Sequence, residues 1–339
     1  MNYKIKKISE INQDNLNKFF KIAFPSRYQA LSKYWKWYYK FSYSDLEPIF
    51  LEYESSIIGM AGLIPEKLSL NGKFEQAIWF TDFYILEKYR KKGFGSILTK
   101  EWMKICPVQI TYCNENSLKI FIKHGWKYNN KMFRKVDPIN IFKFIPILKK
   151  IDLISNSSLL KKILQKEVKN NKIINPKRVE RKNIAEYCKL EEKKMYNNNI
   201  FSIVRDENWF KWRLIDCPYA SDIYEFRYNG DIVLAHIINA NNFARLNILY
   251  TFINNSENND FFSLVYNWCL NNNIDYIWTL CNDQNRFLKE TILNNFLLKK
   301  KLNFACWAEN VNTLTHLNKG LSNSQGFDSD LESNLYQGE

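Results

Sequence analysis

Residues 90–96 read Arg-Lys-Lys-Gly-Phe-Gly-Ser, so two glycines directly follow three consecutive cations. Glycine lets the backbone turn tightly and approach a ligand closely, and the amides at the start of a following helix attract anions. The side chains of Arg90, Lys91 and Lys92 add full positive charge to this loop. The segment therefore predicts a phosphate-binding loop for a ligand that carries several phosphate charges.

The loop lies between a strand-like run at residues 76–86 and a helical run at residues 96–104. This arrangement resembles the acyl-CoA signature of the GCN5-related N-acetyltransferase (GNAT) superfamily, in which an Arg or Gln is followed by x-x-Gly-x-Gly or Ala. Further along, the segment 114–126, which ends in Gly125-Trp126, is similar to that family's later strand-to-helix segment. The two motifs occur in the family's order, and the resemblance covers residues 1–136 directly.

The resemblance implies that acyl-CoA lies across the end of the strand at residues 84–86, with its pantetheine amides paired to the strand backbone. The implied cofactor contacts are Tyr84, Ile85, Leu86, Arg90, Lys91, Lys92, Gly93, Phe94, Gly95, Ser96 and Asn114. The backbone amide of Ile85 or Leu86 would stabilise the oxyanion that forms during acyl transfer. The expected co-substrate is acetyl-CoA or a short hydroxyacyl-CoA.

Asp82 is the candidate catalytic base, because the superfamily often keeps an acidic group or an ordered water just before the pantetheine contact and the attacking amine must lose a proton. Alternatively, this carboxylate pairs with a neighbouring strand or with the acceptor. Phe121 stands where many relatives place a tyrosine that protonates the leaving thiolate, so we expect positioning to contribute most to catalysis. His124 is interpreted as a structural histidine beside the Gly125-Trp126 turn.

The composition is typical of an intracellular globular enzyme with more than one core, since the 339 residues are 46% hydrophobic and 16% aromatic. The seven cysteines form no Cys-x-x-Cys pair, and with three histidines they give no metal-ligand spacing. We expect reduced thiols, a cytoplasmic protein and no metal. The net charge of +14 is spread along the chain, so a nucleic-acid partner is not expected. The first residues do not read as a secretory signal.

Hydrophobic periodicity predicts an α/β fold built on a mixed sheet of the α+β kind. The expected elements of the first half are a strand at 3–8, helices at 15–23 and 28–41, strands at 49–53 and 57–64, the strand 76–86, the helix 96–104, a buried strand at 108–112, a helix at 116–124 and a final polar hairpin from Trp126. The dipeptide Asn71-Gly72 predicts a tight hairpin turn.

The second half of the chain repeats the first. Trp37 precedes Tyr53 by the same interval that separates Trp212 from Tyr228. The segment 111–115, Thr-Tyr-Cys-Asn-Glu, is matched by Thr-Leu-Cys-Asn-Asp at 279–283, and we call the interval from position 111 to position 279 the repeat offset. We therefore predict two tandem GNAT-like domains.

The second copy of the phosphate loop has been lost. When the loop is shifted by the repeat offset, it aligns with Asn258, Phe261 and Ser263 in place of Arg90, Gly93 and Gly95. The surrounding segment 254–260 lacks glycine and positive charge, both of which a pyrophosphate site needs. The second domain is accordingly predicted to be degenerate, which leaves one cofactor site per chain.

The predicted divisions are a GNAT-like acyl-CoA-binding domain at 1–136, a helical linker at 137–178, a second GNAT-like domain without a phosphate loop at 179–317, and a flexible tail at 318–339. The linker is basic and amphipathic. We expect it to pack between domains or in a homodimer, with a membrane surface as the alternative and no stable membrane insertion.

Residues 206–219 combine an aromatic-rich helix with Trp212-Arg213 and then Cys217-Pro218-Tyr219. This pattern resembles tandem-GNAT proteins encoded with bacterial surface-polysaccharide enzymes. The resemblance implies an acyl-CoA-dependent N-acyltransferase that acylates the amine of a dTDP- or UDP-linked amino sugar, a small-molecule acceptor used in O-antigen or capsule synthesis. One alternative is a Fem-like aminoacyl transferase, against which the intact loop at 90–96 argues. A second alternative is a non-catalytic acyl-CoA-binding module.

Overall fold

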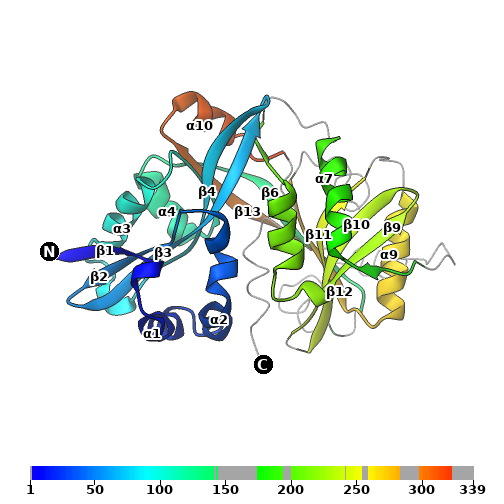
Figure 1. Ribbon diagram of the computed structural model, residues 1–339, viewed down its shortest axis with the longest axis horizontal. Coiled ribbons are helices and arrows are strands. Elements are labelled where there is room, and N and C mark those ends of the chain that lie inside the picture. The colour runs from blue at the N-terminus through cyan, green and yellow to red at the C-terminus, as the bar shows by residue number, and fades with distance from the viewer. Residues whose placement is uncertain are drawn as a thin grey trace, which may run out of the picture.

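The computed structural model describes residues 2–140, 143, 174–193, 200–240, 242–253, 259–282 and 298–322. Figure 1 shows two halves side by side that share strands at the centre of the molecule. Most of the predicted linker at 137–178, of the segment 254–260 and of the tail at 318–339 lies outside the described residues.

The first half follows the predicted order of elements. It comprises β1 (Tyr3–Lys7), η1 (Ile8–Glu10), α1 (Gln13–Ala23), α2 (Tyr28–Tyr38), η2 (Phe41–Tyr43), β2 (Ile49–Tyr53), β3 (Ser56–Leu70), β4 (Lys73–Ile85), η3 (Glu87–Tyr89), α3 (Phe94–Met103), β5 (Val108–Cys113), α4 (Glu115–Lys123) and β6 (Lys127–Pro138). The turn between β3 and β4 has φ angles of 52° at Asn71 and 74° at Gly72, which matches the left-handed pair that a tight hairpin requires.

The second half repeats this order of strands. Its described elements are β7 (Lys177–Arg178), η4 (Arg181–Asn183), α7 (Ile184–Glu192), β8 (Ser202–Ile203), α8 (Glu207–Phe210), the π-helical η5 (Lys211–Ile215), η6 (Ala220–Asp222), β9 (Ile223–Tyr228), β10 (Asp231–Ala240), β11 (Phe243–Phe252), α9 (Asn259–Asn271), β12 (Tyr276–Asn282), β13 (Leu298–Ala308) and α10 (Val311–Leu317).

The two halves share one mixed sheet, in which each half gives its last strand to the other. The order of the described strands is β1-β2-β3-β4-β5-β13-β6-β12-β11-β10-β9-β7, and the short strand β8 pairs with β3. Strand β13, from the end of the second half, lies antiparallel between β5 and β6, while β6 lies antiparallel beside β12. The predicted hairpin from Trp126 is therefore wrong, because residues 127–138 form one long strand whose partners come from the second half.

The register of the sheet confirms that the halves are structural repeats. In the parallel pair β4 and β5, Ile78 lies opposite Gln109, and in the parallel pair β11 and β12, Leu246 lies opposite Ile277. Leu246 and Ile277 lie one repeat offset after Ile78 and Gln109, so the two parallel pairs have the same register. The mixed α/β fold with a large sheet is thus as expected.

The helices cover the two faces of the sheet in the same way in each repeat. Helices α3 and α4 pack on one face of the first repeat, and α9 packs on the matching face of the second. We call this the outer face. Helices α1, α2, α7 and α8 pack on the opposite face, which we call the inner face, and meet where the repeats join (Figure 1).

Two tryptophans at equivalent positions form the contact between the repeats on the inner face. The indole Nε1 of Trp37 donates to the backbone oxygen of Trp212 at 2.9 Å, and Nε1 of Trp212 donates to the backbone oxygen of Trp37 at 2.7 Å. The two rings lie 6.1 Å apart between centroids. Such self-complementary exchange is the pattern of a two-fold symmetric interface, here within one chain.

We expect Trp37→Phe and Trp212→Phe each to lower the free energy of unfolding by about 1–3 kcal/mol more than Trp102→Phe does, because each loses a part-buried indole hydrogen bond. Trp102 is a matched control, since it is fully buried and its Nε1 has no partner. Urea unfolding of the single and double variants measures the effect. Because both hydrogen bonds lie in one contact, the loss of stability in the double variant should differ from the sum of the two single losses. Strictly additive losses would contradict coupling between the two bonds.

Candidate active site

Strand β4 leaves part of its edge open beside β5. The parallel ladder between the strands includes Ile78 and Trp79, and beyond it the hydroxyl of Thr111 donates to the backbone oxygen of Phe80 at 2.7 Å. The carboxyl end of β4 therefore diverges from β5 while it stays paired to β3 on its other side. This is an edge onto which an extended amide-containing ligand could add.

The amide of Ile85 faces that open edge. Leu86 donates its own amide to the backbone oxygen of Ile58 at 2.8 Å, so the Leu86 amide is used within the sheet. Because amides alternate in direction along a strand, the amide of Ile85, which lies opposite Gly59, points away from β3. Of the two oxyanion donors expected from the sequence, Ile85 has the suitable orientation.

The loop after β4 forms the predicted turn into helix α3. Lys91 and Gly93 adopt positive φ angles of 63° and 87°, and Gly93 is the N-cap of α3. The first helical bond runs from the Ile97 amide to the Gly93 oxygen, so the amides of residues 94–96 have no acceptor within the helix. With the exposed side chains of Lys91 and Lys92, this turn has the geometry and the charge of an anion cradle.

Arg90 lies against the strand rather than in front of the helix. Its Nε donates to the backbone oxygen of Ile85 at 2.9 Å, and its guanidinium lies 5.0 Å from the ring centre of Tyr84. The side chain thus ties the loop to the end of the open strand. Its predicted contact with cofactor phosphates is not part of this arrangement and stays a prediction.

Asn114 and Ser96 have contacts within the protein. Asn114 caps helix α4, since its Oδ1 accepts the Ser117 amide at 3.0 Å. The hydroxyl of Ser96 lies 3.1 Å from Nε2 of His124, whose pKa is lowered by partial burial and by the nearby cation of Lys100. The ligand contacts expected at Ser96 and Asn114 remain predictions.

Asp82 lies at a bulge of β4, in a buried ion pair that the sequence analysis did not identify. Its backbone has a φ of 50°, where the register with β3 shifts. One carboxylate oxygen pairs with the Arg27 guanidinium, and the other accepts the Tyr39 hydroxyl at 2.8 Å. Asp82 therefore pairs with residues of the α2 region rather than with a neighbouring strand, and its role as the base stays a prediction.

The charge of Asp82 raises the pKa of the two side chains that contact it. Burial alone would lower the pKa of Arg27, but the adjacent carboxylate outweighs that cost and raises it. Burial and the same carboxylate raise the pKa of Tyr39. Both side chains come from the region of α2, and no local pattern signals that they meet Asp82 across more than forty residues of chain.

Phe121 is a core residue on the outer face. Its ring stacks on Trp126 with centroids 4.7 Å apart and packs edge-on against Phe80 at 5.2 Å. The side chain is almost fully buried. The position therefore supplies no proton to a leaving thiolate, which is consistent with catalysis by positioning.

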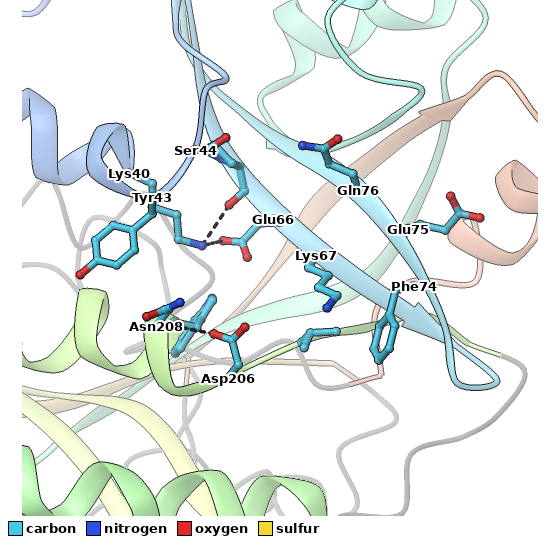
Figure 2. A pocket seen from close by; sticks show the side chains of 13 residues that line it. Lys40, Tyr43, Ser44, Glu66, Lys67, Phe74, Glu75, Gln76, Asp206 and Asn208 are labelled. Atoms are coloured by element: carbon cyan, nitrogen blue, oxygen red, sulfur yellow. Dashed lines mark hydrogen bonds and ion pairs between the residues drawn. The ribbon is translucent and has the colours of Figure 1, made fainter.

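A cavity of about 350 Å³ lies between the repeats at the amino end of β4. Figure 2 shows Lys40 and Glu66 on one side and Asp206 and Asn208 on the other. Lys40 Nζ lies 3.1 Å from Glu66 and 4.2 Å from the ring centre of Trp212, and burial lowers its pKa. The last lining residue on β4, Gln76, precedes Asp82 by six positions, about 20 Å of extended strand. The cavity is therefore separate from the open edge.

Comparison with known proteins places the first repeat in a family. Residues 10–126 match the model of the acetyltransferase (GNAT) family, and this range contains the open strand and the loop at 90–96. No curated protein matches the chain. The first repeat is therefore similar to this family over residues 10–126.

Solved structures share the fold of both repeats. A GCN5-related N-acetyltransferase from Kribbella flavida matches with a TM-score of 0.58 and 8% identity over 90% of this chain and 71% of its own. Saccharomyces cerevisiae N-myristoyltransferase with bound myristoyl-CoA matches with a TM-score of 0.55 and 13% identity over 90% and 82%. A probable N-acyltransferase of Enterococcus faecalis V583 matches with a TM-score of 0.55 and 8% identity over 90% and 72%.

The family match and the shared fold support the predicted enzyme class, an acyl-CoA-dependent N-acyltransferase. Within the described residues, no helix has the length and apolar character needed to cross a bilayer. The same residues contain no group of three side chains suited to holding a metal ion.

We expect the wild-type chain to bind one CoA and Gly93→Val to abolish that binding, because a branched side chain at a positive φ distorts the loop and blocks backbone approach. Gly72→Val is a matched control, since Gly72 also has a positive φ and an added Cβ would meet no atom within 4 Å at either glycine. Isothermal titration with CoA measures both. Two equivalent sites, or equal loss in the two variants, would contradict the assignment of the loop.

If Asp82 accepts the amine proton, Asp82→Asn should lower kcat by about 10²-fold with little change in CoA affinity. Removing one partner of a buried ion pair should also cost about 3–5 kcal/mol of stability, so activity must be measured where circular dichroism shows the variant folded. Asp222→Asn, at an exposed carboxylate, is the control. A higher KM with unchanged kcat, or the same acidic limb of kcat/KM against pH, would assign the base elsewhere.

Proposed function

We propose that this chain transfers an acetyl or short hydroxyacyl group from acyl-CoA to the amine of a nucleotide-linked amino sugar. The observation that carries the proposal is the open edge of β4 directly before the loop at 90–96. Pantetheine can add to that edge as an extra strand while the loop receives the phosphates. The thioester would then lie beside the amide of Ile85.

Acyl-CoA supplies the activated acyl group, and the residues of the chain position it. The Ile85 amide is oriented to donate to the carbonyl oxygen as negative charge develops there, a contact typically worth about 3 kcal/mol. The Arg90 bond to the Ile85 oxygen holds this strand end in place. Asp82, Arg27 and Tyr39 form a rigid polar wall on the inner face, from which the amine would approach.

Within the described residues, the second repeat fills the position equivalent to Asp82, which supports one cofactor site per chain. Tyr250 occupies the position that corresponds to Asp82 under the repeat offset. Its hydroxyl donates to Glu191 at 2.7 Å and accepts from Arg205 at 3.2 Å. The Arg205 side chain is 0% exposed and that of Glu191 is 7% exposed, so the second repeat fills this position with a closed cluster.

Fewer observations support the proposed acceptor than support acyl-CoA as the acyl donor. The likeness of residues 206–219 to surface-polysaccharide enzymes supports an amino sugar carried by dTDP or UDP, used by a cytoplasmic enzyme that acts as a monomer or homodimer. A Fem-like aminoacyl transferase would not need the anion loop at 90–96. A non-catalytic acyl-CoA-binding module would need the loop but would show no turnover.

Release of CoA thiol from acetyl-CoA, measured against a panel of dTDP- and UDP-amino sugars, peptides and polyamines, tests the proposal. We expect turnover with a nucleotide-linked amino sugar and loss of that turnover in Gly93→Val. Turnover only with peptides or polyamines would replace the acceptor class. Tight CoA binding without turnover on any amine would favour the binding module.

A further inference from the structure

Cationic side chains gather on the inner face where the repeats share their strands. Arg134 on β6 lies directly opposite Lys300 on β13 in the antiparallel register. Arg245, on β11, is close enough that its charge acts on Arg134. Side chains alternate along a strand, so Arg134 and Arg245 lie on the same face of the sheet as Met132, Trp278 and Tyr276. These last three side chains pack together on this face. We call Arg134, Arg245 and Lys300 the inner-face cation cluster.

The two arginines of this cluster have no carboxylate partner among the residues that the structure describes. Within the described residues, Arg245 donates a hydrogen bond to the Tyr276 hydroxyl at a long 3.4 Å, and its Nε is buried without a hydrogen-bond partner. By contrast, the buried guanidiniums of Arg27 and Arg205 each pair with an acidic side chain. Burial and the neighbouring charge of Arg245 lower the pKa of Arg134, so the two cations destabilise one another.

Two more buried polar groups beside Arg245 also lack partners in the described part of the chain. They are Nδ1 of His236 and Oδ1 of Asn247, which lie opposite each other on β10 and β11. Burial and the charges of Arg245 and Arg213 lower the pKa of His236 to about 3, so this ring is neutral at physiological pH. Unpaired buried groups of this kind are costly and call for a ligand or water.

The first repeat is apolar at the position equivalent to Asn247. Under the repeat offset, Asn247 corresponds to Trp79, which packs in an apolar cluster of the first repeat. Natural chains keep destabilising polar and charged groups where function requires them. An anion would neutralise the cluster and supply the missing acceptors for its guanidinium donors.

We propose that Arg134 and Arg245 bind the diphosphate of the acceptor, with Lys300 at the exposed side of the cluster; this inference rests on the proposed function and names a part of its acceptor site. Two strands, β5 and β13, separate β4 from β6, so Arg134 lies on the order of 15 Å from the open edge, and Arg245, on β11 beyond β12, lies on the order of 25 Å from it. Tyr276, which is partly exposed, provides aromatic surface beside the arginines for the rest of the nucleotide.

The diphosphate of CoA is not the expected occupant. The phosphate loop leads into α3, which packs on the outer face of the sheet, whereas the cluster lies on the inner face. A donor and an acceptor that approach from opposite faces can meet at the open edge between β4 and β5. The two anion sites then bind separate substrates.

Isothermal titration of the full chain with UDP, dTDP and inorganic pyrophosphate tests the cluster, using Arg134→Gln and Arg245→Gln. We expect each substitution to weaken binding of all three probes by about tenfold or more, because each removes a charge-assisted contact, and to leave CoA affinity unchanged. Arg178→Gln, at an exposed arginine of β7, is the matched control for loss of one positive charge.

Thermal melting separates binding from structural support. Without ligand, Arg134→Gln should melt at or above the wild-type temperature, because it removes an unpaired cation, and pyrophosphate should raise the melting temperature of the wild type alone. A lower melting temperature in that variant with unchanged probe binding would overturn the proposal, as would displacement of pyrophosphate by CoA. Loss of probe binding in both variants would uphold the anion site. If every amine in the panel also fails as an acceptor, the proposed function is rejected while the anion site stands.

Discussion

The exchange of last strands between the repeats is the constraint on which the rest of the structure depends. Strand β13 closes the edge of β5, and β6 closes the edge of β12, so neither half can complete its sheet without the other. An unpaired strand edge exposes a row of amides and carbonyls, which makes such an edge prone to aggregation. The two GNAT-like units are therefore expected to fold as one cooperative body.

The contacts at the junction of the repeats fix the angle at which the two inner faces meet. The reciprocal bonds of Trp37 and Trp212 leave little freedom of rotation, and Lys40 of the first repeat, which pairs with Glu66, lies 4.2 Å from the ring centre of Trp212 in the second. A buried ion pair adds little net stability, since desolvation offsets most of its attraction, but breaking it is costly. Its effect here is to hold Lys40 within the first repeat at the position from which it contacts Trp212.

Local signals predicted the elements of the first half, the Asn71-Gly72 turn, the loop at 90–96 and the internal repeat. They could not predict the partner of residues 127–138, because β13 follows β6 only after most of the second repeat and strand pairing leaves no local periodicity. The same holds for the contacts of Asp82 with Arg27 and Tyr39, which join an ordinary strand to residues of a distant helix region. Strand β6 runs across the predicted boundary at residue 136, and β13 pairs with strands of the other half. The domain boundaries remain a prediction.

Duplication followed by divergence explains why the repeats differ where they do. The first repeat keeps an open β4 edge and a glycine loop, whereas the second fills the position of Asp82 with Tyr250 and replaces the apolar Trp79 with Asn247. If the second repeat has lost its cofactor site, as the sequence predicts, the geometry of that site is no longer needed while the scaffold is kept. A freed inner face can then take on recognition of a second substrate, provided that the shared strands hold it at a fixed distance from the first site. The exchanged strands β6 and β13 meet this condition, because their antiparallel pairing joins the two repeats into one sheet.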